Sequence, residues 1–308
     1  MAADWQAALA RARAHSPFLA RALERQEELA ELLATGGGEA ALARAKAAGA
    51  GAADVGAALR RERLALATVL AIGDLAGAFS LERVTGELSA FADRALHAAL
   101  AAAVARRVPG AAPAGLIALA LGKHGARELN YSSDIDPIVL YDPAPLPRRE
   151  RDEPSEVAQR YVREAVRLLS EVTAEGYVFR VDLRLRPASE VSPPAISLEG
   201  ALSHYESSAL AWERAAFIKA RAAAGDIAAG ERFLASIRPF VWRRSLDFGA
   251  LGDIRRLTAR IRASHAGPRV PGAGSVGSVD QFIDISEVCG STDQPLSVGV
   301  VDGYGTNT

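Results

Sequence analysis

Over roughly the first 110 residues, apolar and polar positions follow a helical pattern. Alanine, leucine, arginine and glutamate dominate this stretch, and alanine is the best helix former. Ser16-Pro17 offers an N-cap followed by a proline in the first turn, and Gly36-Gly37-Gly38 interrupts the next helix. Further helices are expected at 57–75 and from Ser80 onward, where Ser80 caps the start. The apolar face of that last helix would consist of Val84, Leu88, Phe91 and Leu96.

The pattern changes after a short linker at 109–113. Apolar runs at 116–121 and 138–141 have the length of strands and flank a polar, glycine-bearing segment. A helix with apolar positions between Val157 and Val172 follows, and Gly176 is expected to end it. A strict alternation from Tyr177 to Pro187 then predicts another strand. We therefore predict a predominantly helical α+β fold with a small mixed sheet. The predicted regions are helical at 1–112, a core at 113–226, helical again at 227–265 and an atypical tail at 266–308.

Two aspartates open the second strand of the core. Side chains alternate along a strand, so Asp134 and Asp136 should point to the same side. Two carboxylates held so close repel each other unless a cation lies between them. Mg²⁺ is the usual solution, because it takes carboxylate oxygens and completes its shell with water and phosphate. An Asp-x-Asp pair alone is also common in turns and exposed strand ends.

A second segment strengthens the metal interpretation. In the alternation from Tyr177 to Pro187, one face carries Arg180, Asp182, Arg184 and Arg186. One acid among three arginines fits a site where a carboxylate binds metal beside cations that hold phosphate. Neighbouring strands lie under about 5 Å apart. Asp182 could therefore complete a three-carboxylate metal site with Asp134 and Asp136.

The glycine-bearing turn supplies candidate phosphate contacts. Gly122 and Gly125 let the backbone approach a phosphate and direct amide N–H groups at it. Lys123 would contact a phosphate or remain a solvated lysine, and His124 would lie near the site or fill the turn. Ser133 could donate its hydroxyl to phosphate or cap its own turn.

These segments resemble the nucleotidyltransferase core of the bifunctional glutamine synthetase adenylyltransferase/adenylyl-removing enzymes, a family in the polymerase-β-like superfamily. The likeness continues in Ser203-His204-Tyr205-Glu206 and from Ala211 to Arg221, and it extends over roughly residues 15–265. The family carries two such domains in tandem. Three segments of this chain resemble the N-terminal domain, which is associated with AMP removal. They are Ser16-Pro17-Phe18-Leu19, the segment Glu128 to Ser133 and Arg180-Val181-Asp182.

The resemblance implies a function and a set of site residues. Inorganic phosphate would attack the AMP on a tyrosine of glutamine synthetase and release ADP. The family's other activity is the ATP-dependent adenylylation of the same enzyme. Implied partners are glutamine synthetase, ATP or ADP, phosphate and the PII signal protein. Asp134, Asp136 and Asp182 would be catalytic and hold Mg²⁺. Nucleotide and phosphate contacts would come from Gly122, Lys123, Gly125, Ser133, Arg184, Arg186, Arg214, Lys219 and Arg221, with a weaker case for Glu213.

Composition narrows the alternatives. The 308 residues carry a formal net charge of −1, so the global basic field of a nucleic-acid binder is missing. The single cysteine, Cys289, excludes a disulfide or a cysteine zinc site within the chain. No uninterrupted apolar run reaches the ~18–20 residues of a membrane helix. The N-terminus also lacks the pattern of a signal peptide, so the expected location is the cytoplasm, away from membranes.

Some features depart from the family pattern. Pro137 follows the aspartate pair where the family has an aliphatic residue, and Ala126 replaces a glycine in the turn. The tail from Gly267 is rich in glycine and serine, which favours disorder. A truncation or frameshift would also explain it. These departures motivate a second hypothesis, in which the chain is a regulatory fragment that binds glutamine synthetase or nucleotide with weak or no catalysis.

Overall fold

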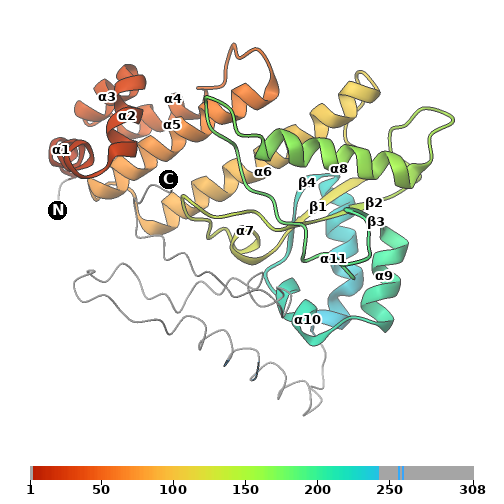
Figure 1. The fold of residues 1–308 in the computed structure, drawn as a ribbon. Helices are drawn as coiled ribbons and strands as arrows, with labels where there is room; N and C mark the ends of the chain where they lie inside the picture. The colour runs from red at the N-terminus through yellow and green to blue at the C-terminus, as the bar shows by residue number, and fades with distance from the viewer. Residues whose placement is uncertain (1–2, 243–255, 257–258, 260–308) are drawn as a thin grey trace.

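The computed structural model describes residues 3–242 together with residues 256 and 259. It begins with the six helices shown in red to yellow in Figure 1. Ser16 Oγ accepts a hydrogen bond from the Leu19 N–H, and Ser80 Oγ accepts one from the Arg83 N–H. Both predicted N-caps are therefore confirmed. The helices are α1 (Trp5–His15), α2 (Pro17–Arg25), α3 (Glu27–Ala34), α4 (Gly38–Lys46), α5 (Val55–Leu75) and α6 (Leu81–Arg107).

The small mixed sheet that the sequence predicted follows, and it has four strands. It consists of β1 (Leu116–Ala120), β2 (Pro137–Tyr141), β3 (Ala195–Ser197) and β4 (Arg221–Gly225), in the order β3-β2-β1-β4. β1 is antiparallel to both β2 and β4, whereas β3 runs parallel to β2. Pro137 is the first residue of β2, opposite Ala120. At a strand start its missing N–H is tolerated.

Five helices complete the described chain: α7 (Gly122–Ala126), α8 (Pro154–Ser170), α9 (Leu198–Ser207), α10 (Ala211–Phe217) and α11 (Ile227–Val241). The prediction that Gly176 ends the helix of residues 157–172 is wrong. α8 ends at Ser170, and Glu171 is already extended. Val172 is 76% exposed, so it adds no packing that could prolong the helix. Gly176 instead exchanges backbone hydrogen bonds with Thr173. The predicted tail at 266–308 lies outside the described residues.

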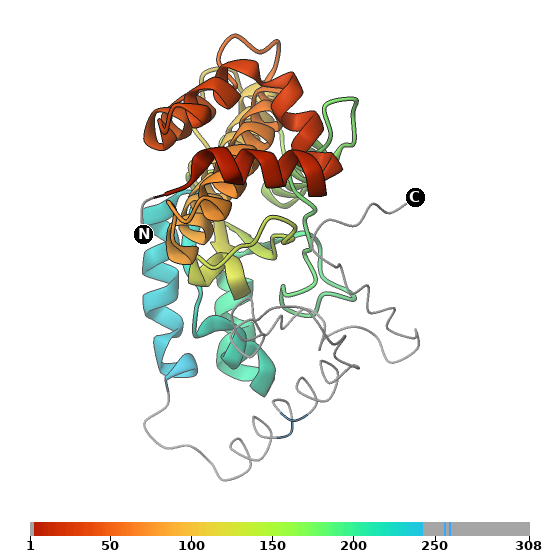
Figure 2. The ribbon, with the colours of Figure 1, turned by 90° about the vertical axis from the view of Figure 1, so that its left-hand side faces the viewer.

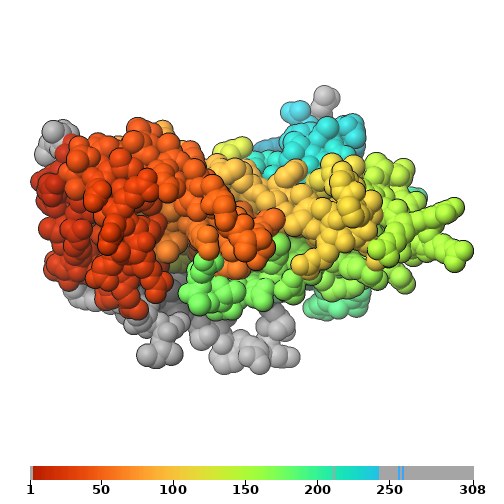
Figure 3. Space-filling model, turned by 90° about the horizontal axis from the view of Figure 1, so that it is seen from above, coloured from red at the N-terminus to blue at the C-terminus, as the bar shows by residue number. Residues whose placement is uncertain are grey.

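The two faces of the sheet are buried in separate apolar cores. On β1, Leu116 and Ala118 pack with α8 and the N-terminal helices, whereas Ile117 and Leu119 pack with α9 and α11. Figures 1 and 2 show α6 and α8 on one side of the sheet and α9, α10 and α11 on the other. Figure 3 shows that the N-terminal helices form one end of an elongated body. The sheet is therefore the layer between two cores.

α6 connects these parts. It packs against α5, α8 and β4. It is also the one helix in the described part of the chain with the length and mean hydropathy to cross a membrane, and 56% of its apolar window is buried in the protein. A core helix passes the same test. The contacts of α6 account for its apolar character.

Candidate functional site

The backbone brings the two predicted acidic segments together. Ile135 and Val181 form an isolated parallel bridge. The Ile135 N–H donates to the Arg180 carbonyl at 3.1 Å, and the Asp182 N–H donates to the Ile135 carbonyl at 2.9 Å. The segment that carries Asp134 and Asp136 therefore runs beside Asp182, as the sequence predicted.

The second segment is not a strand, however, so its predicted four-residue face is wrong. Only Val181 makes a ladder contact, and the chain turns after Asp182. The Asp182 carboxylate accepts the backbone N–H of Arg184 at 2.8 Å. This local hydrogen bond favours a turn over an extended ladder. Arg186 consequently points into the loop that follows, where its guanidinium donates to the carbonyls of Leu183, Ser189, Ser192 and Pro193.

Two of the three aspartates are paired with arginines. The exposed Asp134 forms an ion pair with Arg180, and Asp182 accepts the Arg184 Nε at 2.7 Å. Asp136 is only 8% exposed. Among the residues that the structure describes, no group of three His, Cys, Asp or Glu side chains is close enough to hold a metal ion. The donor set consists of hard oxygens and fits Mg²⁺ in kind, but Asp134 and Asp182 would have to exchange arginine for metal.

The glycine turn lies directly beside Asp136. Gly122 has a φ of 54°, and a Cβ there would lie 4.0 Å from Asp136 Oδ2. A Cβ on Gly125 would lie 2.3 Å from the Lys219 carbonyl oxygen, so only glycine fits. Arg127 ends α7 in the left-handed conformation, with a φ of 62°. Ala126 is the last helical residue and avoids that region, so replacing glycine at 126 causes no backbone strain.

A partly buried ionic network supports this turn from the side of α6. Asp93 accepts two hydrogen bonds from Arg221, both 2.8 Å long, and lies 2.8 Å from His124 Nε2. Arg221 also donates to the His124 carbonyl at 3.0 Å. Arg221 was predicted to bind phosphate, but its guanidinium is used within this network. Asp93 was not predicted, because on the sequence it is one more charge on a helix.

The network fixes the charge states of its members. Burial alone would raise the pKa of Asp93, but the hydrogen bonds from His124 and Arg221 hold it below its ordinary value. Burial lowers the pKa of His124, and the nearby Asp93 only partly opposes this. His124 is therefore neutral near pH 7, and it most simply donates its Nε2–H to Asp93.

The other predicted contacts near the turn are engaged within the protein. Ser133 Oγ accepts the Asn130 N–H at 3.1 Å and donates to the Asn130 side-chain oxygen at 2.9 Å. Lys219 is paired with Glu128 at 3.0 Å, and both side chains are solvent-accessible. Lys123 lies half-buried in α7. The exposed pair of Lys219 and Glu128 leaves the ammonium open to competition from a phosphate.

The predicted residues on α10 belong to the core beneath the sheet. The Arg214 guanidinium lies over the Phe240 ring, 5.4 Å from its centroid. Glu213 is buried, accepts the Leu210 N–H at 2.7 Å and lies 2.8 Å from His204 Nε2. These contacts join α9, α10 and α11, which gives Glu213 a structural role.

Comparison with known proteins supplies the family. A family model described as glutamate-ammonia ligase adenylyltransferase matches residues 5–236. The bifunctional glutamine synthetase adenylyltransferase/adenylyl-removing enzymes of Caulobacter vibrioides and Xanthobacter autotrophicus are each 44% identical, over 77% and 82% of this chain. The corresponding enzyme of Rhizobium meliloti is 45% identical over 67%. The matches cover 26%, 27% and 22% of those proteins, so the chain spans about a quarter of their length. It belongs to the glutamate-ammonia ligase adenylyltransferase family.

Proposed function

We propose that this chain is a nucleotidyltransferase domain that removes AMP from adenylylated glutamine synthetase, with inorganic phosphate as acceptor and ADP as product. The observation that carries the proposal is the bridge between Ile135 and Val181. It brings the segment that carries Asp134 and Asp136 beside the segment that carries Asp182. The matched relatives are named for both adenylyl transfer and adenylyl removal. The resemblance of Arg180-Val181-Asp182 and of residues 128–133 to the family's N-terminal domain supports removal.

The site residues divide into carboxylates and cations. Asp134, Asp136 and Asp182 would hold Mg²⁺, which when bound neutralises charge on the nucleotide and aligns attacking and leaving groups. Arg180 and Arg184 now balance two of these carboxylates, and both arginines are exposed. If Asp134 and Asp182 held a metal, Arg180 and Arg184 would be available to phosphate oxygens. The acceptor phosphate therefore meets positive charge where the aspartates alone would repel it.

The glycine turn would position the nucleotide. Its backbone can approach a phosphate closely because Gly122 and Gly125 have no side chains. Arg221 is paired with Asp93 and donates a hydrogen bond to the His124 carbonyl, which fixes the turn. The adenylylated tyrosine belongs to glutamine synthetase, so no tyrosine of this chain is required for the reaction. The chain's contribution is to orient the nucleotide and stabilise charge.

The test is ADP release from adenylylated glutamine synthetase in the presence of Mg²⁺ and phosphate. Asp134→Asn combined with Asp136→Asn removes the metal-binding charge and should lower the rate by roughly 10²-fold or more. Asp142→Asn is the matched control. Asp142 lies at the opposite end of β2, and its Oδ1 accepts the Ala144 N–H, which asparagine can also do. Equal rates for the double variant and the wild type would refute the proposed centre.

A second function is favoured by one observation. The carboxylates at 134 and 182 are already neutralised by arginines, so the fold is consistent with binding without turnover. In that case the chain would bind glutamine synthetase or nucleotide as a regulatory fragment. A folded wild-type chain that binds Mg²⁺-nucleotide but releases no ADP would select this function over catalysis.

A further inference from the structure

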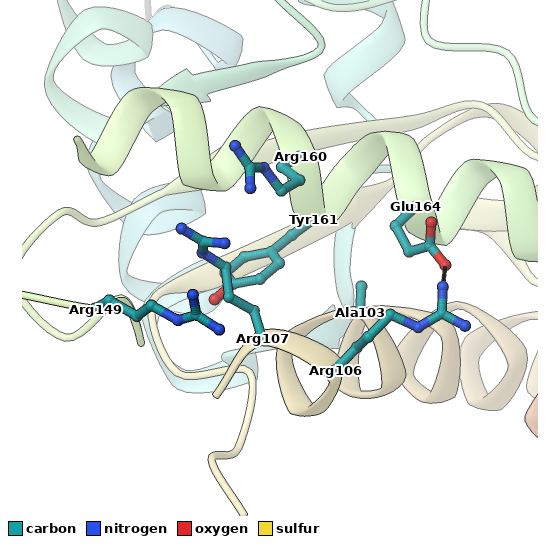
Figure 4. A pocket seen from close by; sticks show the side chains of 7 residues that line it. All are labelled: Ala103, Arg106, Arg107, Arg149, Arg160, Tyr161 and Glu164. Atoms are coloured by element: carbon teal, nitrogen blue, oxygen red, sulfur yellow. Dashed lines mark hydrogen bonds and ion pairs between the residues drawn. The ribbon is translucent and has the colours of Figure 1, made fainter. Parts of the chain in front are cut away.

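A cationic cavity lies between the C-terminal end of α6 and the first half of α8. Figure 4 shows three arginines on one side of it and the Tyr161 ring behind them. Its volume is about 220 Å³. One wall comes from α6, one from α8, and one from the loop between β2 and α8. The lining residues are Ala103, Arg106, Arg107, Arg149, Arg160, Tyr161 and Glu164.

Positive charge exceeds negative charge around this cavity. Arg106 is paired with Glu164, and Arg107 is paired through two nitrogens with Asp152. Arg149 and Arg160 also line the cavity, but neither forms a side-chain ion pair with a carboxylate in the described part of the chain. Four guanidiniums and one carboxylate, Glu164, thus line the cavity, with Asp152 close to Arg107 and Arg149, on a protein whose formal net charge is −1. An excess of guanidiniums over carboxylates attracts a compact anion.

The Tyr161 side chain lines the cavity and is held by burial and by a hydrogen bond. Tyr161 is 1% exposed and donates its hydroxyl to the Pro147 carbonyl at 2.7 Å. Burial and the nearby Asp152 raise the pKa of this hydroxyl, and Arg107, Arg160 and Arg149 act in the opposite direction. All three of these arginines line the same cavity as Tyr161. The Tyr161–Pro147 bond also holds the loop that carries Arg149 against α8.

The cavity is separate from the proposed catalytic centre. Asp136 immediately precedes β2, whereas the loop with Arg149 leaves from its other end after Tyr141. β2 has five residues, so its two ends are roughly 17 Å apart at about 3.3 Å per residue.

We propose that this cavity is a binding site for a phosphoryl anion, recognised by Arg149 and Arg160 with Arg107 beside them. Arginine recognises phosphate because its planar fork matches two oxygens at once. The volume equals that of roughly seven liquid waters at about 30 Å³ each. It admits a phosphate group with a few waters and is below the roughly 300–1,000 Å³ of pockets for drug-sized ligands. The site does not depend on the proposed reaction.

The test is calorimetric titration of the full chain with inorganic phosphate at constant ionic strength. Arg149→Ala combined with Arg160→Ala removes the two lining guanidiniums that form no side-chain ion pair in the described part of the chain. Arg151→Ala combined with Arg163→Ala is the matched control, because it removes two exposed charges from the same loop and helix without touching the lining. Both titrations are repeated with Asp134→Asn and Asp136→Asn also present. The proposed catalytic centre is then the same in the lining variant and the control variant, so any difference in phosphate binding between them arises at the cavity. Glycerol phosphate in place of phosphate distinguishes an esterified ligand from the free ion.

We expect the lining variant to weaken phosphate binding at least roughly tenfold, because two charge-assisted contacts are lost. The control variant should bind like the wild type, and ADP release should be unchanged in both. If both double variants weakened phosphate binding equally, the loss would reflect the overall surface charge and not this cavity, and the proposal would be overturned. Phosphate binding that survives intact in the lining variant, or is absent in the wild type, would overturn it as well. Unfolding curves of each variant establish that the fold is retained.

Discussion

A carboxylate that is largely removed from water needs its charge balanced nearby. The charge of Asp93 is balanced by Arg221, which donates two hydrogen bonds to it, and the neutral His124 contributes a third hydrogen bond. These residues come from β4, from α7 and from the middle of α6. The network therefore joins the N-terminal helices to the glycine turn with directional contacts that apolar packing does not provide. Disrupting it should affect both stability and the position of the turn.

Asp93→Asn is expected to lower the free energy of unfolding by about 2–3 kcal/mol, since it weakens hydrogen bonds to a charged group and leaves Arg221 without its counter-charge. Urea unfolding at pH 7 measures this. Asp74→Asn on α5 is the control, because burial raises the pKa of Asp74 without an ionic partner to oppose it. That substitution should be neutral or stabilising. A similar loss in both variants would contradict a specific role for the Asp93 network.

At the residue scale, the sequence predicted what depends on local hydrogen bonds. The caps at Ser16 and Ser80 depend on residues three positions away, so the pattern alone was sufficient. The role of Arg221 depends on Asp93, which lies 128 positions away in the sequence. Arg221 was consequently predicted as a phosphate ligand, and Asp93 was not predicted at all. Nothing in the spacing of helical charges distinguishes a solvated aspartate from a paired one.

At the element scale, the turn formed by α7 is positioned by close backbone contact. Its five residues are too few for a stable isolated helix. Gly125 instead packs against the carbonyls of Ala120 and Lys219, which lie 2.7 and 2.3 Å from where a Cβ would be. Gly86 on α6 differs, because a Cβ there would meet no atom within 4 Å. The two glycines offer a matched pair for substitution.

Gly125→Ala is expected to destabilise the protein by about 1–3 kcal/mol through overpacking. The substitution should also shift the turn and reduce nucleotide binding. Gly86→Ala is expected to stabilise the protein by about 0.5–1 kcal/mol, because alanine loses less backbone entropy in a helix. Thermal unfolding of both variants checks that Gly125→Ala is destabilising and Gly86→Ala stabilising. Nucleotide titration checks the loss of binding in Gly125→Ala. A neutral Gly125→Ala would show that the turn can move away from β1 at little cost.

The segment from Tyr177 to Pro187 shows where element prediction failed. Its alternation is that of a strand, but only Val181 forms a bridge to a neighbouring segment. Beyond it, the Asp182 carboxylate takes the N–H of Arg184, and the following turn is filled by Arg186. Alternation reports side-chain polarity but not whether a neighbouring strand is present. The sequence thus correctly predicted that the segment of Asp182 lies beside the segment of Asp134 and Asp136. The prediction that the arginines share one face of a strand with Asp182 is wrong, because that strand does not form.

At the scale of the whole molecule, the sheet separates two cores that no sequence boundary divides. The first core joins α1 to α6 with α8 and one face of β1, and so crosses the boundary predicted at residue 112. The second joins the other face of β1 with α9, α10 and α11. Because α6 also contacts β4, unfolding of either core would expose the sheet to water. The N-terminal helices should therefore unfold together with the sheet and not as a separate domain.

This cooperativity can be measured with the tryptophans of the full chain. Trp5 packs edge-on to Phe79 in the first core, whereas Trp212 packs against the second. A variant with Trp212→Phe and Trp242→Phe reports on the first core, and one with Trp5→Phe and Trp242→Phe reports on the second. In each variant, the fluorescence midpoint in urea should coincide with the midpoint from far-ultraviolet circular dichroism, as two-state unfolding requires. If Trp5 fluorescence changes before the circular dichroism signal does, the N-terminal helices form an independent unit and the shared core is not cooperative.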